Sequence, residues 1–238
     1  MALYVYGLVD AARSLPPDLL GVADAPPRLL PMGDVGVVVS DLDDERVDLD
    51  MEDVAAHAAV VDALFAAGTV LPFRVGMAGD ETVLRAELEP RIRIYADRLR
   101  RLEGQCELEV RAWLEEEAAL ASVLARSPRA RSLSQTVGPG SSFDEQLRLG
   151  ELLGSELEAQ KQLAASALDE ELAPLAVEIS VMAPAESEAF RAAYLVSGAS
   201  AGDFARRARI AEQQMPGLHV DVAGPVPPYS FADPPPDR

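Results

Sequence analysis

The segment CELEVRAWL at 106–114 alternates cleanly and constrains the second half of the chain. Its residues at 108, 110, 112 and 114 are apolar and share one face, which predicts a strand buried on one side. The other, outward face is expected to carry Glu107, Glu109, Arg111 and Trp113. The elements expected after it are a helix at 115–126, a long helix at about 144–172, strands at 175–184 and 189–198, a helix at 200–217 and a strand at 218–224. The resulting order, β-α-β-β-α-β, predicts a ferredoxin-like domain.

The first half has a different order, β-β-α-β-α. The expected elements are strands at 3–9, 35–42 and 69–76, a helix at 51–67 and a helix from about 80 to 104. Pro72 should interrupt the third strand or place it at an edge, and Pro90 should kink or split the second helix. We therefore expect an α+β protein with an N-terminal α+β domain at 1–104, a ferredoxin-like domain at 105–224 and an extended Pro-rich tail at 225–238.

Other segments lack helical or strand periodicity. A Pro- and Gly-rich stretch after the first strand, at 16–27, indicates a loop. The stretch 127–143, rich in Ser, Gly, Pro and Arg, indicates a mobile loop. In the long helix, leucines are expected on or near the inner face at 147, 152 or 153, 157, 163 and 168.

Charge excludes several classes of partner. The chain has 238 residues and a formal net charge of −19, which disfavours binding to nucleic acid or to anionic lipid. No apolar run approaches the roughly 20 residues needed to cross a bilayer, and the N-terminus lacks the features of a secretory signal. We expect a cytoplasmic protein that binds neither nucleic acid nor membrane.

The sequence offers no recognisable catalytic constellation. It contains no nucleophile elbow, P-loop or dinucleotide-binding glycine motif. Its two histidines, His57 and His219, lie in no metal-ligand spacing. An acidic run at 41–53 lacks the spacing of a calcium loop and resembles a solvated helix N-terminus. We therefore expect no enzyme activity, no cofactor and no metal.

Four single features allow both an architectural and a functional interpretation. His57 lies on the apolar stripe of its helix, which favours a core histidine over a hydrogen bond to a partner, and Cys106 favours an inert packed thiol. Arg74 favours a structural arginine paired with a carboxylate. The tail, with Tyr229 and Phe231 among its prolines, favours folding back on the protein over forming a docking strip.

Several segments together resemble the gas vesicle accessory proteins GvpF and GvpL. They are YVYGLV at 4–9, HAAVV at 57–61, TVLPFRVG at 69–76, EGQCELEV at 103–110, AAYLV at 192–196 and GPVPPYSF at 224–231. These segments occur in the family's order and cover most of the chain. The sequence departs from the family pattern at Val75, where an aromatic residue is usual, and at Val226, where a tryptophan is usual.

The resemblance implies an intracellular, non-catalytic protein that supports gas vesicle assembly. It also implies binding to the shell protein GvpA and to other gas vesicle accessory proteins, and association with the vesicle. The motif positions, which either bind a partner or have a purely architectural role, are Pro72, Phe73, Arg74, Pro228, Tyr229 and Phe231. A minor structural component of the vesicle shell is the first alternative, and a ferredoxin-like sensory domain for a small ligand is a more distant one.

Overall fold

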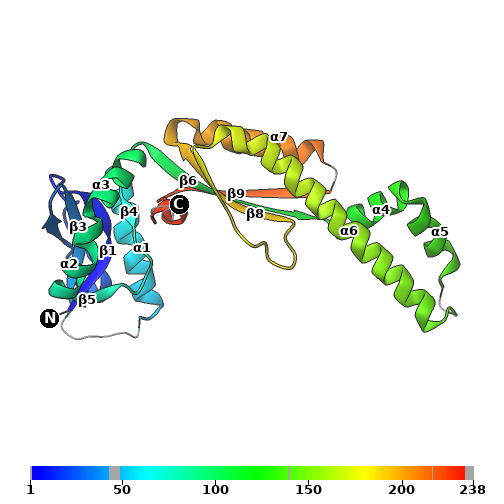
Figure 1. Ribbon diagram of the computed structural model, residues 1–238, viewed down its shortest axis with the longest axis horizontal. Helices are drawn as coiled ribbons and strands as arrows, with labels where there is room; N and C mark the ends of the chain where they lie inside the picture. The colour runs from blue at the N-terminus through cyan, green and yellow to red at the C-terminus, as the bar shows by residue number, and fades with distance from the viewer. Residues whose placement is uncertain (1, 43–48, 139, 216, 234–238) are drawn as a thin grey trace. The chain divides into compact units, whose positions relative to one another are not determined.

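The computed structural model describes residues 2–42, 49–138, 140–215 and 217–233 (Figure 1). The chain forms two compact units. The first comprises Met1–Glu107, Leu195–Ala199 and Gly224–Arg238, and the second comprises Leu108–Tyr194 and Ser200–Ala223. The end of the chain therefore belongs to the same unit as its first hundred residues. Most of the acidic run, 43–48, lies outside the described residues.

The first unit contains a five-stranded sheet with the order β2-β3-β1-β4, in which β5 also pairs with β1. Its strands are β1 (Ala2–Asp10), β2 (Arg28–Met32), β3 (Val35–Leu42), β4 (Leu71–Pro72) and β5 (Ala78–Asp80), and their pairings are antiparallel. The strands predicted at 3–9 and 35–42 are confirmed.

Two expectations for this sheet were wrong. The bounds predicted for the strand at 69–76 were too long, because β4 covers only Leu71–Pro72 and the chain regains pairing at β5. The effect expected of Pro72 is confirmed, since β4 ends at this residue and lies at one end of the strand order. Strand β2 was missed, since Pro26 and Pro27 favoured a loop. It lies at the edge of the sheet, where Pro31 is tolerated because no further strand needs its missing N–H group.

Helices cover this sheet. They are α1 (Met51–Ala66), α2 (Glu81–Leu88) and α3 (Ile92–Arg101), with short 3₁₀ turns η1 (Val22–Asp24) and η2 (Glu89–Arg91). The Asp50 side chain accepts hydrogen bonds from the backbone N–H groups of Glu52 and Asp53, and this cap fixes the start of α1. Pro90 splits the second predicted helix into α2 and α3, as expected.

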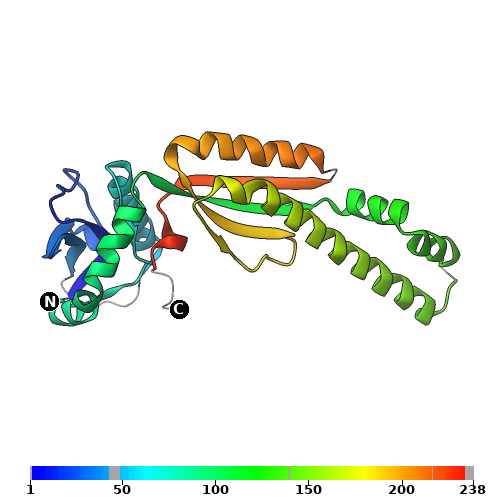
Figure 2. The same ribbon diagram turned by 45° about the horizontal axis from the view of Figure 1, so that its top comes forward.

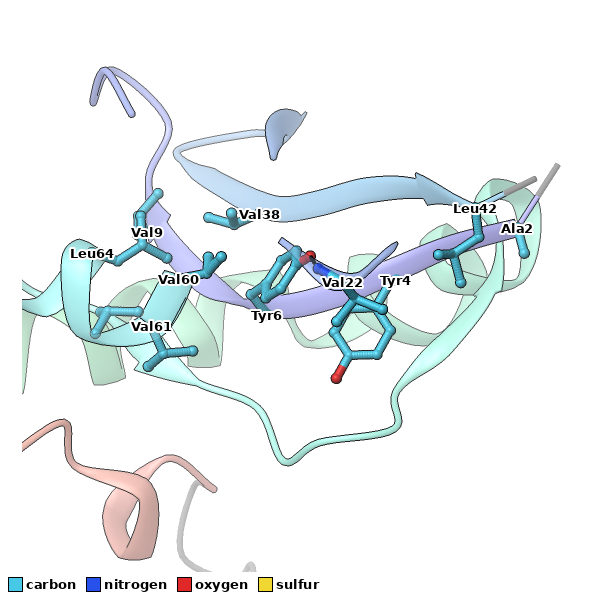
Figure 3. Packing of buried hydrophobic residues seen from close by; sticks show 11 residues of the cluster. Ala2, Tyr4, Tyr6, Val9, Val22, Val38, Leu42, Val60, Val61 and Leu64 are labelled. Carbon is cyan, nitrogen blue, oxygen red and sulfur yellow. Dashed lines mark hydrogen bonds between the residues drawn. The ribbon is translucent and has the colours of Figure 1, made fainter. Parts of the chain in front are cut away.

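Strand β1 is buried along almost its whole length, because α1 contacts it and α3 contacts both it and β3. One side of the strand joins a core cluster with α1. Figure 3 shows Tyr6 and Val9 of β1 together with Val60 and Leu64 of α1. A strand covered on both faces requires a continuous apolar sequence, and the opening ALYVYGLV supplies one.

The second sheet has the strand order β7-β8-β6-β9. In chain order its strands and helices are β6 (Gln105–Leu114), α4 (Glu116–Arg126), α5 (Pro128–Thr136), α6 (Phe143–Leu172), η3 (Ala173–Leu175), β7 (Glu178–Val181), β8 (Phe190–Ser197), η4 (Gly198–Ser200), α7 (Ala201–Gln214) and β9 (Leu218–Val226). These elements follow the predicted β-α-β-β-α-β order, with α4 and α5 inserted before the long helix. A last 3₁₀ turn, η5 (Tyr229–Phe231), belongs to the first unit.

Within the second unit, α6 and α7 lie side by side over the sheet (Figure 2). The buried Tyr194 of β8 joins the two layers. Its hydroxyl donates a hydrogen bond to Asp169 of α6 at 3.0 Å, and its ring lies 5.0 Å from that of Phe204 of α7. The other face carries charged side chains, where Arg191 pairs with Glu109 at 2.8 Å. The one-sided burial predicted for 106–114 is therefore confirmed except at Glu107, which is buried.

Two expectations for the helical part of this unit were wrong. The stretch 127–143 contains helix α5, which Ser127 caps by accepting a hydrogen bond from the N–H group of Ala130 at 3.3 Å. The prediction of a loop depended on the Ser, Gly, Pro and Arg content of the stretch, but Pro128 lies at a first helical position, where proline is compatible with a helix. In α6, Leu147 and Leu163 are exposed. Leu163 is off the helical period, and Leu147 belongs to the N-terminal half of α6, which continues past the strands (Figure 2).

We expect Gly7→Ala to lower the free energy of unfolding by about 1–3 kcal/mol, as over-packing does. A Cβ atom at this position would lie 2.6 Å from the carbonyl oxygen of Leu71, where β1 and β4 approach each other. Urea unfolding followed by circular dichroism measures the change. Gly79→Ala is the matched control, since its Cβ would meet Leu84 at an ordinary 3.9 Å. Equal stability of the two variants would contradict the close approach.

Candidate functional site

The six motif positions all lie in the first unit. Pro72 and Pro228 are buried, Phe73 and Tyr229 are half-buried, and Phe231 is 1% exposed. Arg74 is exposed. Five of the six positions therefore contribute mainly to the architecture of the unit, and one presents its side chain to solvent.

A chain of hydrogen bonds connects the segment after β4 to the core. The backbone N–H of Phe73 donates to the carbonyl of Tyr6 at 2.9 Å, and the carbonyl of Phe73 lies 3.1 Å from Nε2 of His57. Nδ1 of His57 lies 3.0 Å from the hydroxyl of Tyr4, which accepts from the N–H of Gly76. A carbonyl can only accept, so Nε2 carries the proton and Nδ1 accepts from Tyr4.

The environment of His57 keeps the imidazole neutral. The side chain is 1% exposed, and its ring stacks on that of Tyr6 at 5.6 Å. Burial lowers the pKa of His57 below its usual value, and the hydrogen bond to Phe73 opposes this shift in part. Both ring nitrogens are engaged within the protein, so the interpretation of His57 as a core histidine is confirmed.

The C-terminal segment is held by two buried charged side chains. Glu107 accepts hydrogen bonds from the backbone N–H of Ser230 at 2.8 Å and from its hydroxyl at 2.7 Å. Arg98 of α3 donates from Nε to the carbonyl of Phe231 at 2.6 Å. These contacts give partners to the N–H group of Ser230 and the carbonyl of Phe231, and the side chain of Phe231 is buried. The segment therefore folds back on the chain.

Tyr229 adds an apolar contact to this arrangement. It packs against the core cluster that α1 forms with β1. Burial raises the pKa of its hydroxyl to about 12, and the nearby Asp62 and Tyr4 contribute to the rise. The hydroxyl therefore stays protonated at neutral pH and is a hydrogen-bond donor rather than an acid.

The expectation for Arg74 was wrong. Among the described residues, no carboxylate lies within ion-pair distance of its guanidinium. The adjacent Val75 is 41% exposed. The hydrogen-bonded neighbours Phe73 and Gly76 fix the backbone on both sides of this pair. The side chains of Arg74 and Val75 are thus exposed to solvent, and hydrogen bonds hold the backbone before and after them.

The remaining candidates offer little for chemistry. Cys106 is buried, and burial raises the pKa of its thiol, which disfavours the reactive thiolate. His219 is half exposed and stacks on Trp113 at 5.9 Å. Within the described residues, no three His, Cys, Asp or Glu side chains are grouped to hold a metal ion. In the same part of the chain, no helix is both long and apolar enough to cross a membrane.

Sequence reasoning missed three residues that organise this region: Tyr4, Arg98 and Glu107. Tyr4 looked like any other residue of a buried strand. Glu107 was placed on the outward face of its strand with Glu109 and Arg111, but it is buried. Its partner Ser230 is 123 positions away, so no local pattern could reveal the contact.

Stability should fall in mild acid because of His57. Its pKa is lower in the folded protein, so the unfolded chain binds the proton more readily, and stability is complete above about pH 6.5 and lost as the pH falls below it. The loss can reach about 1.4 kcal/mol per pH unit until the folded-state pKa is reached. Urea midpoints at pH 7.5 and 5.5 measure it. The urea midpoint of His57→Gln should change less between the two pH values than that of the unaltered chain. An equal change in the two proteins would contradict His57 as the origin of the pH dependence.

Glu107→Gln should loosen the C-terminal segment. The neutral amide removes the negative charge of the carboxylate, so its bond to the N–H of Ser230 is weaker, and the hydroxyl of Ser230 has to turn and accept from the amide nitrogen instead of donating. We expect a loss of about 1–3 kcal/mol and faster hydrogen exchange at the amides of 230–232. Glu103→Gln, at an exposed position, is the control. Unchanged protection of the Ser230 amide would show that Glu107 does not hold the segment.

Comparisons with known proteins agree on one family. The family model described as "Gas vesicle synthesis protein GvpL/GvpF" matches residues 2–233. Gas vesicle protein F of Streptomyces sp. (strain CB03234) is 31% identical over 239 residues, covering 98% of this chain and all of that protein. Gas vesicle protein L of the same strain is 29% identical over 252 residues, covering 96% and 92% of the two chains.

A solved structure shows the same fold. The crystal structure of GvpF from Anabaena sp. PCC7120 superposes with a TM-score of 0.85 at 22% identity and covers 98% of each chain. This similarity supports the mixed α+β architecture with two antiparallel sheets. The chain belongs to the GvpL/GvpF family of gas vesicle synthesis proteins.

Proposed function

We propose that this chain is a non-catalytic accessory protein that supports gas vesicle assembly by binding the shell protein GvpA and other gas vesicle accessory proteins. The observation that carries the proposal is the family match, which extends over residues 2–233. The commitment of both His57 nitrogens to internal hydrogen bonds supports a binding role over a catalytic one. We place the protein in the cytoplasm, in association with the vesicle.

The physical role follows from the problem that a shell protein poses. A subunit with a large apolar face aggregates in water unless a partner covers that face. A partner with a net charge of −19 keeps such a complex soluble by electrostatic repulsion between complexes. Holding or nucleating shell subunits in this way requires a binding surface and no chemistry.

Within this proposal, the architecture is an N-terminal α+β domain at 1–104, a ferredoxin-like domain at 105–224 and a tail at 225–238. The order of β6, the helices, β7, β8, α7 and β9 supports the ferredoxin-like description, as does a sheet in which β8 and β6 are the central strands. The tail is a structural strap rather than a free docking strip, which its hydrogen bonds to Glu107 and Arg98 support.

Of the motif positions, Arg74 is the one we assign to partner binding. Its side chain is exposed, and its backbone is held by the hydrogen bonds of the neighbouring Phe73 and Gly76. Because this backbone is already ordered, only the side chain of Arg74 has to become ordered when its guanidinium pairs with a carboxylate of a partner. Val75 beside it supplies an exposed apolar contact.

Arg74→Glu should weaken capture of GvpA while leaving the fold unchanged. The tagged chain is co-expressed with GvpA, captured by affinity and analysed by quantitative mass spectrometry. We expect at least about a tenfold loss of GvpA, because the substitution replaces an attractive charge with a repulsive one. Arg91→Glu is the matched control, since Arg91 is an exposed arginine of the same unit.

Two results would count against the proposal. Failure of the unaltered chain to capture GvpA in soluble form would contradict GvpA binding. Equal capture by the Arg74→Glu and Arg91→Glu variants would contradict the assignment of Arg74 and leave the binding surface elsewhere on the chain.

A further inference from the structure

One helix of the second unit carries an apolar stripe that its own unit covers only in part. Helix α6 has 30 residues and is about 45 Å long, whereas the ten residues of β6 extend about 33 Å. Its C-terminal half is buried through Ala164, Leu168 and Leu172. Figure 2 shows its N-terminal half continuing past the strands beside α4 and α5. The inner face of this half therefore lacks a sheet to pack against.

The stripe continues into this half with the spacing of a coiled-coil seam. Phe143, Leu147, Gly150, Gly154 and Leu157 follow one another at alternating intervals of four and three residues. The same spacing passes through Lys161, whose amine donates to the carbonyl of Glu186 at 3.2 Å, and leads on to the buried Ala164 and Leu168. We call the five residues the α6 seam. Phe143 is 76% exposed and Leu147 is 48% exposed.

Helices α4 and α5 leave most of the seam uncovered, since Leu157 is half-buried and the other four seam residues are exposed. They contact α6, and Ser127 between them donates a hydrogen bond to Glu156 at 3.0 Å. Each residue turns the helix by about 100°, so the two steps from Gly154 to Glu156 place these residues on nearly opposite sides of α6. The two neighbouring helices therefore occupy a side of α6 other than the seam.

The two glycines of the seam have no internal explanation. A Cβ atom at Gly150 or Gly154 would meet no atom within 4 Å, and neither residue has a positive φ that would require glycine. Glycine within a helix is destabilising relative to alanine. Its benefit here is the open space it leaves for the side chains or backbone of another helix. The two glycines thus leave the seam open to a close approach by another helix, at a cost in stability to the isolated chain.

Charge beside the seam indicates what kind of helix fits. Asp144, Glu151 and Glu158 recur every seven residues along one flank, where coiled coils place the charges that select partners. The opposite flank carries the uncharged Gln146 and Leu153. An antiparallel second copy of this chain would bring two acidic rows together, and each copy has a net charge of −19. A helix with basic residues beside its apolar stripe is complementary.

We propose that the α6 seam docks an amphipathic helix of a partner protein, with large apolar residues that fill the space at the glycines and with Lys or Arg residues facing the acidic row. The inference goes beyond the binding function proposed for Arg74 and uses none of its residues. It assigns a recognition role to the N-terminal half of α6.

A pair of synthetic peptides tests the proposal on the full chain. Both have four heptads with Leu and Ile at the seam positions. The basic peptide has Lys at both flanks and the acidic peptide has Glu, so that like charges oppose self-association of either. Binding of the labelled peptides is followed by fluorescence anisotropy at physiological salt. We expect binding of the basic peptide and none of the acidic one.

Variants separate specific docking from general attraction to an acidic protein. Phe143→Ser/Leu147→Ser, which leaves the charge unchanged, and Glu151→Lys/Glu158→Lys should each weaken binding by at least about tenfold. Glu87→Lys/Glu170→Lys, at exposed positions off the seam, changes the charge equally and should bind like the unaltered chain. Circular dichroism verifies that each variant is folded, as expected for exposed substitutions.

Four outcomes would overturn the proposal. The first is the absence of binding by the unaltered chain, and the second is full binding by the Phe143→Ser/Leu147→Ser variant. The third is an equal loss with Glu87→Lys/Glu170→Lys, which would show attraction by net charge alone. The fourth is a dimer of the unaltered chain that Phe143→Ser/Leu147→Ser abolishes in sedimentation, because the occupant would then be a second copy.

Discussion

The first unit depends on burying β1 on both of its faces. Helices on each side remove the strand from water, so its polar groups must find partners inside the protein. The ladder with β3, β4 and β5 satisfies the backbone, and the side chains of His57 and Ser40 satisfy the hydroxyls of Tyr4 and Tyr6. Because His57 also holds the carbonyl of Phe73, the same network that closes the core fixes the segment that presents Arg74.

This dependence explains why the family motifs are mostly internal. Pro72 and Phe73 lie where the chain leaves the sheet, and Pro228 and Phe231 lie where the end of the chain returns to the same unit. A motif can identify a family because its residues form the fold, without any of them touching a partner. The residues available for recognition are then the exposed neighbours that these internal contacts hold in place.

Much of the fold could be predicted from local patterns. The strand at 106–114, the apolar run of β1 and the break at Pro90 each depend on residues close in sequence, and all three were predicted correctly apart from the burial of Glu107. The local patterns failed where proline lies inside a regular element. Pro31 lies in an edge strand and Pro128 is the first residue of a helix, and both positions tolerate proline. The amino-acid composition of a segment does not show at which position of an element its prolines lie.

The candidate site was less accessible to sequence reasoning, because its contacts are long-range. Glu107 alternates in sequence with outward-facing residues, yet it is buried once the end of the chain covers it. In α6 the difference is in the other direction, because apolar residues that were expected to be buried are exposed. Its stripe predicts burial along the whole helix, but burial stops where the sheet stops, and sequence alone does not tell how far a helix extends beyond its support. Apolar residues that keep the period without being covered, beside glycines that no internal contact requires, mark a surface that is suited to another molecule.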